Sequence, residues 1–179
     1  AMPCNKRAPG TGCQAKAGFN RSLAVLGTSE HCIASHPSDM AVAMMALNAI
    51  VEVEGHDGTS RQIALNDLYC LPGTTPDIRK VRDRSSYAFA LVSIAALVKV
   101  EDGKISTAAL AFGGLAPKPW RNSEIEAELM GKAPSNALFD RAADILLTDA
   151  QGYGENDFKI PLARRTLKAV LSTLTEVSQ

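Results

Sequence analysis

Three of the four cysteines in this chain lie within its first 32 residues, at Cys4, Cys13 and Cys32. The backbone between them is rich in glycine and proline, which favours irregular loops over helices and strands. Thiolates gathered on irregular backbone are the ligands of iron–sulfur clusters and of zinc sites. Because His31 and His36 lie beside the third cysteine, a zinc site stays open as an alternative. Free thiols that bind no metal are the other alternative.

A polar pair, Ser38 and Asp39, stands where an apolar helical pattern begins. A hydroxyl and a carboxylate at the start of a helix can bond the hydroxyl groups of a nucleotide cofactor. The same side chains are also good helix N-caps, and that role alone explains the pair equally well. The residues therefore leave both interpretations open, a cofactor contact and a plain cap.

The elements that must position these residues can be read from periodicity and turn signals. The pattern predicts a helix that begins at residues 38–39, a hairpin of residues 49–53 and 61–65, a helical turn at 66–69, a strand at 87–100 with a returning strand at 105–112, and helices from Ser123, from about 135 to 150 and from about 157 to 177. Ser123 and Glu126 have the spacing of a capping box. The sequence therefore predicts an α+β protein with a boundary between two units near residues 71–78.

Composition excludes several classes of protein. The chain has 179 residues, 46% of them hydrophobic, which is typical of a globular protein rather than a disordered one. Its 19 basic and 19 acidic side chains cancel, which predicts no nucleic-acid partner. The longest apolar stretch, residues 87–98, is too short to cross a bilayer, and no signal peptide is visible. Cys70, far from the other three, is interpreted as an ordinary half-buried thiol.

Several stretches together resemble the FAD-binding (medium) subunit of the xanthine dehydrogenase, or molybdenum hydroxylase, family. The nearest likeness is to the flavin subunit of its bacterial periplasmic aldehyde oxidoreductase branch. The matching stretches are Cys4–Arg7, Gly12–Cys13, Cys32–Ala34, His36–Ala43, Lys80–Arg84, Ser86–Ser93, Gly113–Gly114 and Lys118–Arg121. They extend over almost the whole chain.

The resemblance implies a particular fold and two domains. Residues 1–78 would be a partial FAD-binding subdomain, a remnant of the family's second one, with a cysteine-rich iron–sulfur loop. Residues 79–179 would be a CO dehydrogenase flavoprotein C-terminal-like domain, an antiparallel sheet packed on a three-helix unit. The family's N-terminal FAD subdomain, with its Gly-Gly-Thr pyrophosphate loop, has no match here, and relatives carry further residues at Ile78–Arg79. We therefore expect a fragment that is inactive in isolation.

The resemblance also implies two cofactors. Cys4, Cys13 and Cys32 match three of the four ligands of a [4Fe–4S] cluster. The FAD would be contacted by a set of residues at two places, Ser38 and Asp39 near its ribityl or ribose region and Lys80 near its isoalloxazine ring. The positive charge of Lys80 would stabilise the anionic reduced flavin. The alternative interpretation of Lys80 is a solvated basic strand end.

In the intact enzyme of this family, the implied partners are a large molybdenum-cofactor subunit and a small [2Fe–2S] subunit. Electrons would pass from substrate oxidation at molybdenum, through the [2Fe–2S] centres, to FAD and then to an acceptor, with aldehydes as the expected substrates. The alternative function is a non-catalytic module that docks on partner subunits and binds no cofactor. The compartment stays open, either the cytoplasm or, as part of a complex, the periplasm.

Overall fold

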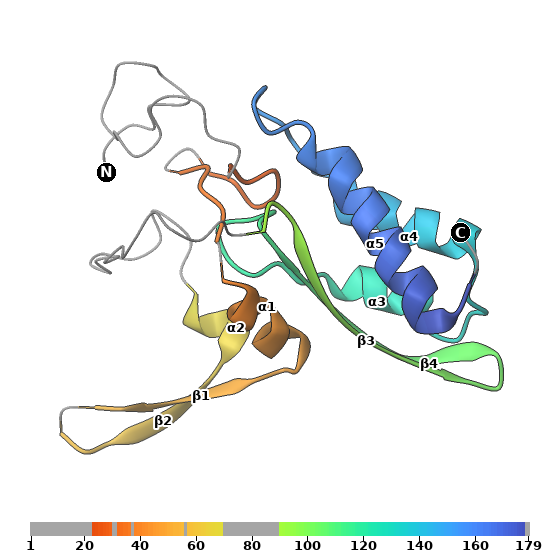
Figure 1. The fold of residues 1–179 in the computed structure, drawn as a ribbon. Coiled ribbons are helices and arrows are strands. Elements are labelled where there is room, and N and C mark those ends of the chain that lie inside the picture. The colour runs from red at the N-terminus through yellow and green to blue at the C-terminus, as the bar shows by residue number, and fades with distance from the viewer. Residues whose placement is uncertain (1–22, 30–31, 37, 56, 70–89, 178–179) are drawn as a thin grey trace.

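The computed structural model describes residues 23–29, 32–36, 38–55, 57–69 and 90–177, in which helices pack beside two antiparallel strand pairs (Figure 1). The elements are α1 (Asp39–Ala46), β1 (Ile50–Glu54), β2 (Ser60–Ala64), α2 (Leu65–Leu68), β3 (Ser93–Glu101), β4 (Lys104–Gly113), α3 (Ser123–Leu129), α4 (Asn136–Leu147) and α5 (Lys159–Thr175). This arrangement confirms the predicted α+β class. The predicted domain boundary at residues 78–79 lies outside the described ranges and stays a prediction.

The N-terminal elements form a small unit around α1. This helix begins after Ser38, whose Oγ accepts a hydrogen bond from the backbone N–H of Ala41 at 3.2 Å. The apolar spacing typical of the helix continues as far as Ile50, but the helix ends earlier, because Asn48 adopts a left-handed conformation with φ of 54°. The chain then turns into the predicted hairpin, in which Ile50 pairs with Ala64.

The turn of this hairpin is closed by a side-chain hydrogen-bond pair. The carboxylate Oδ1 of Asp57 accepts from the Thr59 hydroxyl at 2.7 Å and from the Thr59 N–H at 3.1 Å. These bonds favour the charged carboxylate, so they lower the pKa of Asp57 below its ordinary value of 3.8. The hydroxyl makes the larger contribution to this lowering of the pKa.

Replacing Thr59 with valine is therefore expected to raise the pKa of Asp57 back toward 3.8, because only the backbone donor remains. A carboxyl whose pKa is lowered by folding stabilises the fold above its unfolded pKa. That contribution disappears as the pH falls through the lower folded pKa. An NMR titration of the Asp57 carboxyl in both proteins measures the change. An unchanged pKa in T59V would contradict the assigned cause.

The C-terminal unit is a long hairpin covered by three helices. β3 and β4 pair antiparallel from Ser93–Gly113 to Glu101–Lys104, and α3, α4 and α5 lie together beside them (Figure 1). Leu110 and Phe112 of β4 join the core formed with these helices, whereas Ala111 packs in the core cluster of α1. The end of β4 is thus buried on both faces, and it joins the two units. No helix in the described ranges is long and apolar enough to cross a membrane.

The predicted capping box at the start of α3 is wrong by one residue. The N-cap is Asn122, whose Oδ1 accepts from the N–H of Glu124 at 2.8 Å, and Ser123 is already the first helical residue. The carboxylate of Glu126 accepts from the backbone N–H of Leu110 at 2.9 Å and pairs with Arg121, the residue before the cap. Tertiary partners therefore replace the local capping role that the spacing predicts.

Candidate functional site

The two predicted flavin contacts in the described part of the chain lie side by side at the N-terminal end of α1. Ser38 is half-buried, and its hydroxyl accepts the capping hydrogen bond from Ala41. Asp39 is exposed in the first turn of the helix, where the positive end of the dipole favours an anion. Lys80 lies outside the described residues. The flavin contact at Lys80 therefore stays a prediction.

The residues just before Ser38 tie this end of the helix to its surroundings. The Nδ1 atom of His36 accepts from the N–H of Ser38 at 3.3 Å. The same ring makes a T-shaped contact with the ring of Tyr69, with 4.9 Å between ring centroids and 81° between the planes. Burial raises the pKa of the Tyr69 hydroxyl above its ordinary value. Through His36, these contacts hold the backbone of Ser38 against Tyr69.

Cys32 is the one predicted cluster ligand that the described ranges include, since Cys4 and Cys13 fall outside them, as does His31. Its side chain is half-buried and forms no disulfide, and its Sγ accepts a hydrogen bond from the backbone N–H of Ala34 at 3.4 Å. Amide donors of this kind stabilise a thiolate. Among the described residues, no group of three or more His, Cys, Asp or Glu side chains could hold a metal ion.

The segment that carries Cys32 is docked on the C-terminal unit by its backbone. Leu23 and Ala34 form an isolated antiparallel bridge, and the N–H of Ala24 donates to the carbonyl of Ile33 at 2.8 Å. On its other side, the N–H of Val25 donates to the carbonyl of Leu115 at 2.8 Å. The position of the Cys32 segment therefore depends on residues more than 80 positions further along the chain.

Two fully buried polar residues at the start of α5 complete this docking. Lys159, which is 0% exposed, donates from Nζ to the carbonyls of Leu23 at 2.9 Å and Gly114 at 2.7 Å. Asn156, also 0% exposed, donates to the carbonyl of Ala24 at 3.1 Å. Sequence reasoning missed both residues, because a lysine at the edge of an amphipathic helix normally indicates a solvated side chain.

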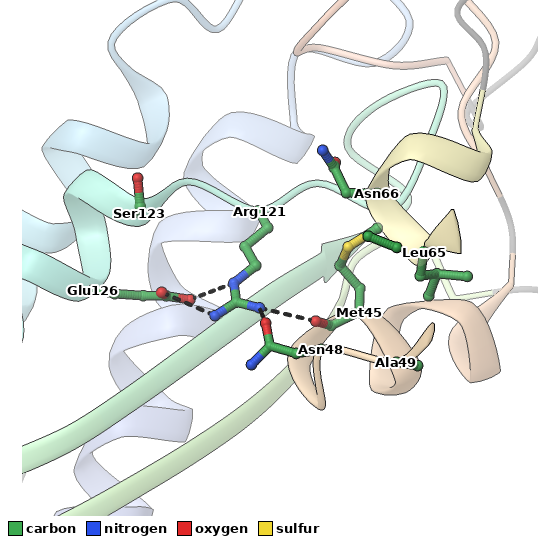
Figure 2. Close-up of a pocket in the computed structure, with 9 residues that line it drawn as sticks. Met45, Asn48, Ala49, Leu65, Asn66, Arg121, Ser123 and Glu126 are labelled. Atoms are coloured by element: carbon green, nitrogen blue, oxygen red, sulfur yellow. Dashed lines mark hydrogen bonds and ion pairs between the residues drawn. The ribbon is translucent and has the colours of Figure 1, made fainter. Parts of the chain in front are cut away.

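A crevice of about 340 Å³ lies at the other end of α1, where the two units meet (Figure 2). Its lining combines apolar and polar side chains from both units, namely Met45, Asn48, Ala49, Ala64, Leu65, Asn66, Arg121, Ser123 and Glu126. In Figure 2, the guanidinium of Arg121 lies between the carboxylate of Glu126 and the end of α1, where Met45 and Asn48 are. The crevice is separated from Ser38 by the length of the helix, about 12 Å for eight residues.

Arg121 bonds both units at once. Its guanidinium pairs with the Glu126 carboxylate through two hydrogen bonds, Nε to Oε1 at 2.8 Å and Nη2 to Oε2 at 3.1 Å. Its Nη1 donates to the carbonyl of Met45 at 3.1 Å and to Oδ1 of Asn48. The side chains of Arg121 and Glu126 are only 22% and 14% exposed, so solvent screens this pair less than a surface ion pair.

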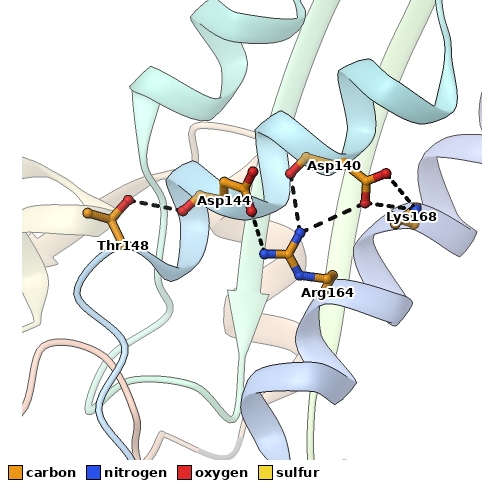
Figure 3. Close-up of polar contacts among 5 residues, drawn as sticks. All are labelled: Asp140, Asp144, Thr148, Arg164 and Lys168. Carbon is orange, nitrogen blue, oxygen red and sulfur yellow. Dashed lines mark hydrogen bonds and ion pairs between the residues drawn. The ribbon is translucent and has the colours of Figure 1, made fainter.

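A second polar network joins α4 to α5 on the outside of the C-terminal unit (Figure 3). Lys168 donates to both carboxylate oxygens of Asp140, at 2.8 and 2.9 Å, and Arg164 pairs with Asp144. These side chains are between 31% and 64% exposed, so each pair contributes at most about 1 kcal/mol. We interpret the network as surface stabilisation, and it provides matched control residues.

Comparison with known proteins identifies relatives along the whole chain. Residues 78–174 match the family described as CO dehydrogenase flavoprotein C-terminal domain. The chain is 45% identical, over 196 aligned residues and 96% of its length, to the aldehyde oxidoreductase FAD-binding subunit PaoB of Escherichia coli K12. It is 30% identical, over 56% of its length, to the glyceraldehyde dehydrogenase medium chain of Sulfolobus acidocaldarius. It spans 58% and 42% of these two relatives' lengths.

Solved structures share the fold at low sequence identity. Quinoline 2-oxidoreductase from Pseudomonas putida 86 superposes with a TM-score of 0.63 at 17% identity, covering 78% of this chain and 56% of that one. A carbon monoxide dehydrogenase from Hydrogenophaga pseudoflava, which lacks the Mo-pyranopterin moiety of its molybdenum cofactor, gives 0.60 at 20% identity. That match covers 74% of this chain and 54% of the dehydrogenase chain. These likenesses agree with the predicted C-terminal fold.

Proposed function

The chain belongs to the family of FAD-binding medium subunits of molybdenum hydroxylases, and on this premise we propose that it is the FAD-binding, electron-transferring part of an aldehyde-oxidising complex. The observation that carries the proposal is the 45% identity, over 96% of the chain, to an aldehyde oxidoreductase FAD-binding subunit. The proposed partners are a large subunit with the molybdenum cofactor and a small subunit with [2Fe–2S] centres. Bound FAD supplies the electron-accepting chemistry of such a subunit.

The proposed flavin contacts on this chain are Ser38 and Asp39, together with Lys80. The exposed carboxylate of Asp39 can accept hydrogen bonds from sugar hydroxyls, and that capacity fits the ribityl or ribose part of FAD. The hydroxyl of Ser38 already accepts one backbone bond, so toward a ligand it has its proton to donate and one remaining acceptor position. This donor and acceptor set fits a polyol and does not require a phosphate.

A [4Fe–4S] cluster on Cys4, Cys13 and Cys32 is the finer part of the proposal. Its support is the half-buried Sγ of Cys32, which already accepts an amide hydrogen bond from Ala34. Such second-shell amides orient and tune thiolate ligands. A cluster needs four ligands as a rule, so a fourth would have to come from outside these three cysteines.

Titration of the purified chain with FAD, followed by the flavin absorption band, tests the proposal. Replacing Asp39 with asparagine is expected to weaken binding roughly 10-fold, because a hydrogen bond to a charged group is lost. The matched control is Asp67→Asn, which neutralises an exposed carboxylate in the first turn of α2 and should leave the affinity unchanged. Failure of the unaltered chain to bind FAD would contradict the proposed function.

The alternative function, docking without a cofactor, is favoured by one observation. Met40 and Leu47, seven residues apart on one side of α1, are 75% and 63% exposed although they are large and apolar. Exposed apolar side chains on an otherwise apolar helix are typical of a surface that another protein covers. If the chain binds no FAD yet binds the partner subunits, docking alone would be the better description.

A further inference from the structure

We propose that Arg121 is a positioning residue. It fixes the orientation of α1 on the C-terminal unit, and therefore the position of Ser38 and Asp39 at the other end of the helix. The proposal rests on the proposed function, since it treats that end of α1 as part of the flavin site. It gives Arg121 a role in flavin binding, although Arg121 is not itself a proposed flavin contact. α1 is anchored to the C-terminal unit at both of its ends and in its middle.

At its N-terminal end, α1 is connected to the C-terminal unit through the residues that precede it. The N–H of His36 donates to the carbonyl of Ala116 at 2.7 Å, and the N–H of Gly114 donates to the carbonyl of His36 at 3.4 Å. His36 in turn accepts from the N–H of Ser38. The cap residue is therefore linked through His36, by two successive hydrogen bonds, to the backbone that follows β4.

In its middle, α1 lies directly against β4 at a glycine. A Cβ atom at Gly113 would come within 2.7 Å of Cγ2 of Val42, closer than side-chain atoms approach. The absence of that atom lets the helix lie close on the strand, and Val42 is 1% exposed as a result. This contact fixes the separation of helix and strand, and apolar burial by itself has no directional preference.

At its C-terminal end, Arg121 supplies the directional contact. The guanidinium bonds the Met45 carbonyl, which belongs to the last turn of α1 and carries the negative end of the helix dipole. The same group pairs twice with Glu126, which also binds the Leu110 N–H in β4. One planar group thus links the helix end, α3 and β4, and a lysine could not reproduce its fork.

An eight-residue helix has little stability of its own, so its orientation depends on such contacts. Without Arg121, α1 keeps the Gly113 contact in its middle and the apolar packing of its last turn, but it loses the directional hydrogen bond to the Met45 carbonyl. A tilt about Val42 then moves the opposite end, where Ser38 and Asp39 lie. The expected result is weaker flavin binding with an intact C-terminal core.

The test uses the full chain with the double substitution Arg121→Met and Glu126→Gln, in which glutamine can still accept from Leu110 and no unpaired carboxylate is left. We expect hydrogen exchange of the α1 amides, such as that of Leu47, to quicken at least 10-fold while exchange in α4 is unchanged. We also expect the dissociation constant for FAD to rise roughly 10-fold. Arg121→Lys should give intermediate values for both, because an ammonium cannot pair with Glu126 through two parallel bonds.

Arg164→Met is the matched control, because it removes an arginine ion pair of the same C-terminal unit far from α1. It should change neither the exchange of α1 nor FAD binding. Unchanged α1 exchange in the double variant would overturn the proposal, and so would faster exchange with unaltered FAD affinity. If the unaltered chain binds no FAD, the proposed function fails, and the exchange data alone decide whether Arg121 anchors the helix.

Discussion

Replacing Lys159 with methionine is expected to lower the free energy of unfolding by about 3 kcal/mol and to release the segment that carries Cys32. The substitution removes two charge-assisted hydrogen bonds, to the carbonyls of Leu23 and Gly114, in a site that water does not reach. The buried Gly114 carbonyl would lose this donor, whereas the Leu23 carbonyl would keep the longer bond from Nδ2 of Asn156 at 3.3 Å. For a chain of this size the loss corresponds to a fall of roughly 6–12 °C in Tm.

Thermal unfolding followed by circular dichroism measures this fall, and hydrogen exchange of residues 23–36 reports the release of the segment. Lys168→Met is the matched control, because Lys168 pairs with Asp140 on the surface, where both side chains are more than 30% exposed. It should cost at most about 1 kcal/mol. Equal losses of Tm in the two variants would contradict a special role for Lys159.

Replacing Gly114 with alanine is expected to cost about 3 kcal/mol, because two penalties act at the same residue. Its φ of 75° lies in the left-handed region, where a residue with a Cβ costs about 1–2 kcal/mol. The added Cβ would also lie well inside van der Waals contact with the backbone carbonyl oxygen of Leu91. A backbone atom cannot turn aside as a flexible side chain can, so overpacking adds roughly 1–3 kcal/mol.

Gly103→Ala separates the two penalties. Gly103, in the turn between β3 and β4, has a φ of 71°, and no atom lies within 4 Å of a Cβ built on it. It should therefore show the left-handed cost alone, about 1–2 kcal/mol. Chemical denaturation of both variants gives the difference. If G114A were no less stable than G103A, the close approach of the Leu91 carbonyl would not be what requires glycine at position 114.

Local signals explain why most elements could be predicted. The hairpin of β1 and β2 surrounds a glycine-rich turn, and β4 follows the Asp102–Gly103 turn, where both residues have positive φ. The helix start at Ser38 was predicted because a short polar side chain there can accept a nearby N–H. These features depend on residues within a few positions of one another, and such residues can be compared directly in a sequence.

Other expectations failed where a distant partner competed with a local one. The Ser123–Glu126 spacing is that of a capping box, but Glu126 bonds Leu110 and Arg121, so Asn122 caps α3 instead. The predicted flavin contact at Lys80 and the predicted cluster ligands Cys4 and Cys13 lie outside the described residues and stay predictions. Ser38 and Asp39 do lie together, but adjacency in sequence already required that.

The sequence by itself determined the family and the order of elements, because motifs and periodicity are properties of neighbouring residues. It could not indicate that Lys159 reaches Leu23, 136 positions earlier, or that Arg121 reaches the end of α1 more than 70 positions away. Those contacts exist only because the end of β4 is buried on both faces and brings α1, α5 and the Cys32 segment to one place. Tertiary packing therefore decided which charged side chains became buried anchors, since burial removes the water that would otherwise satisfy them.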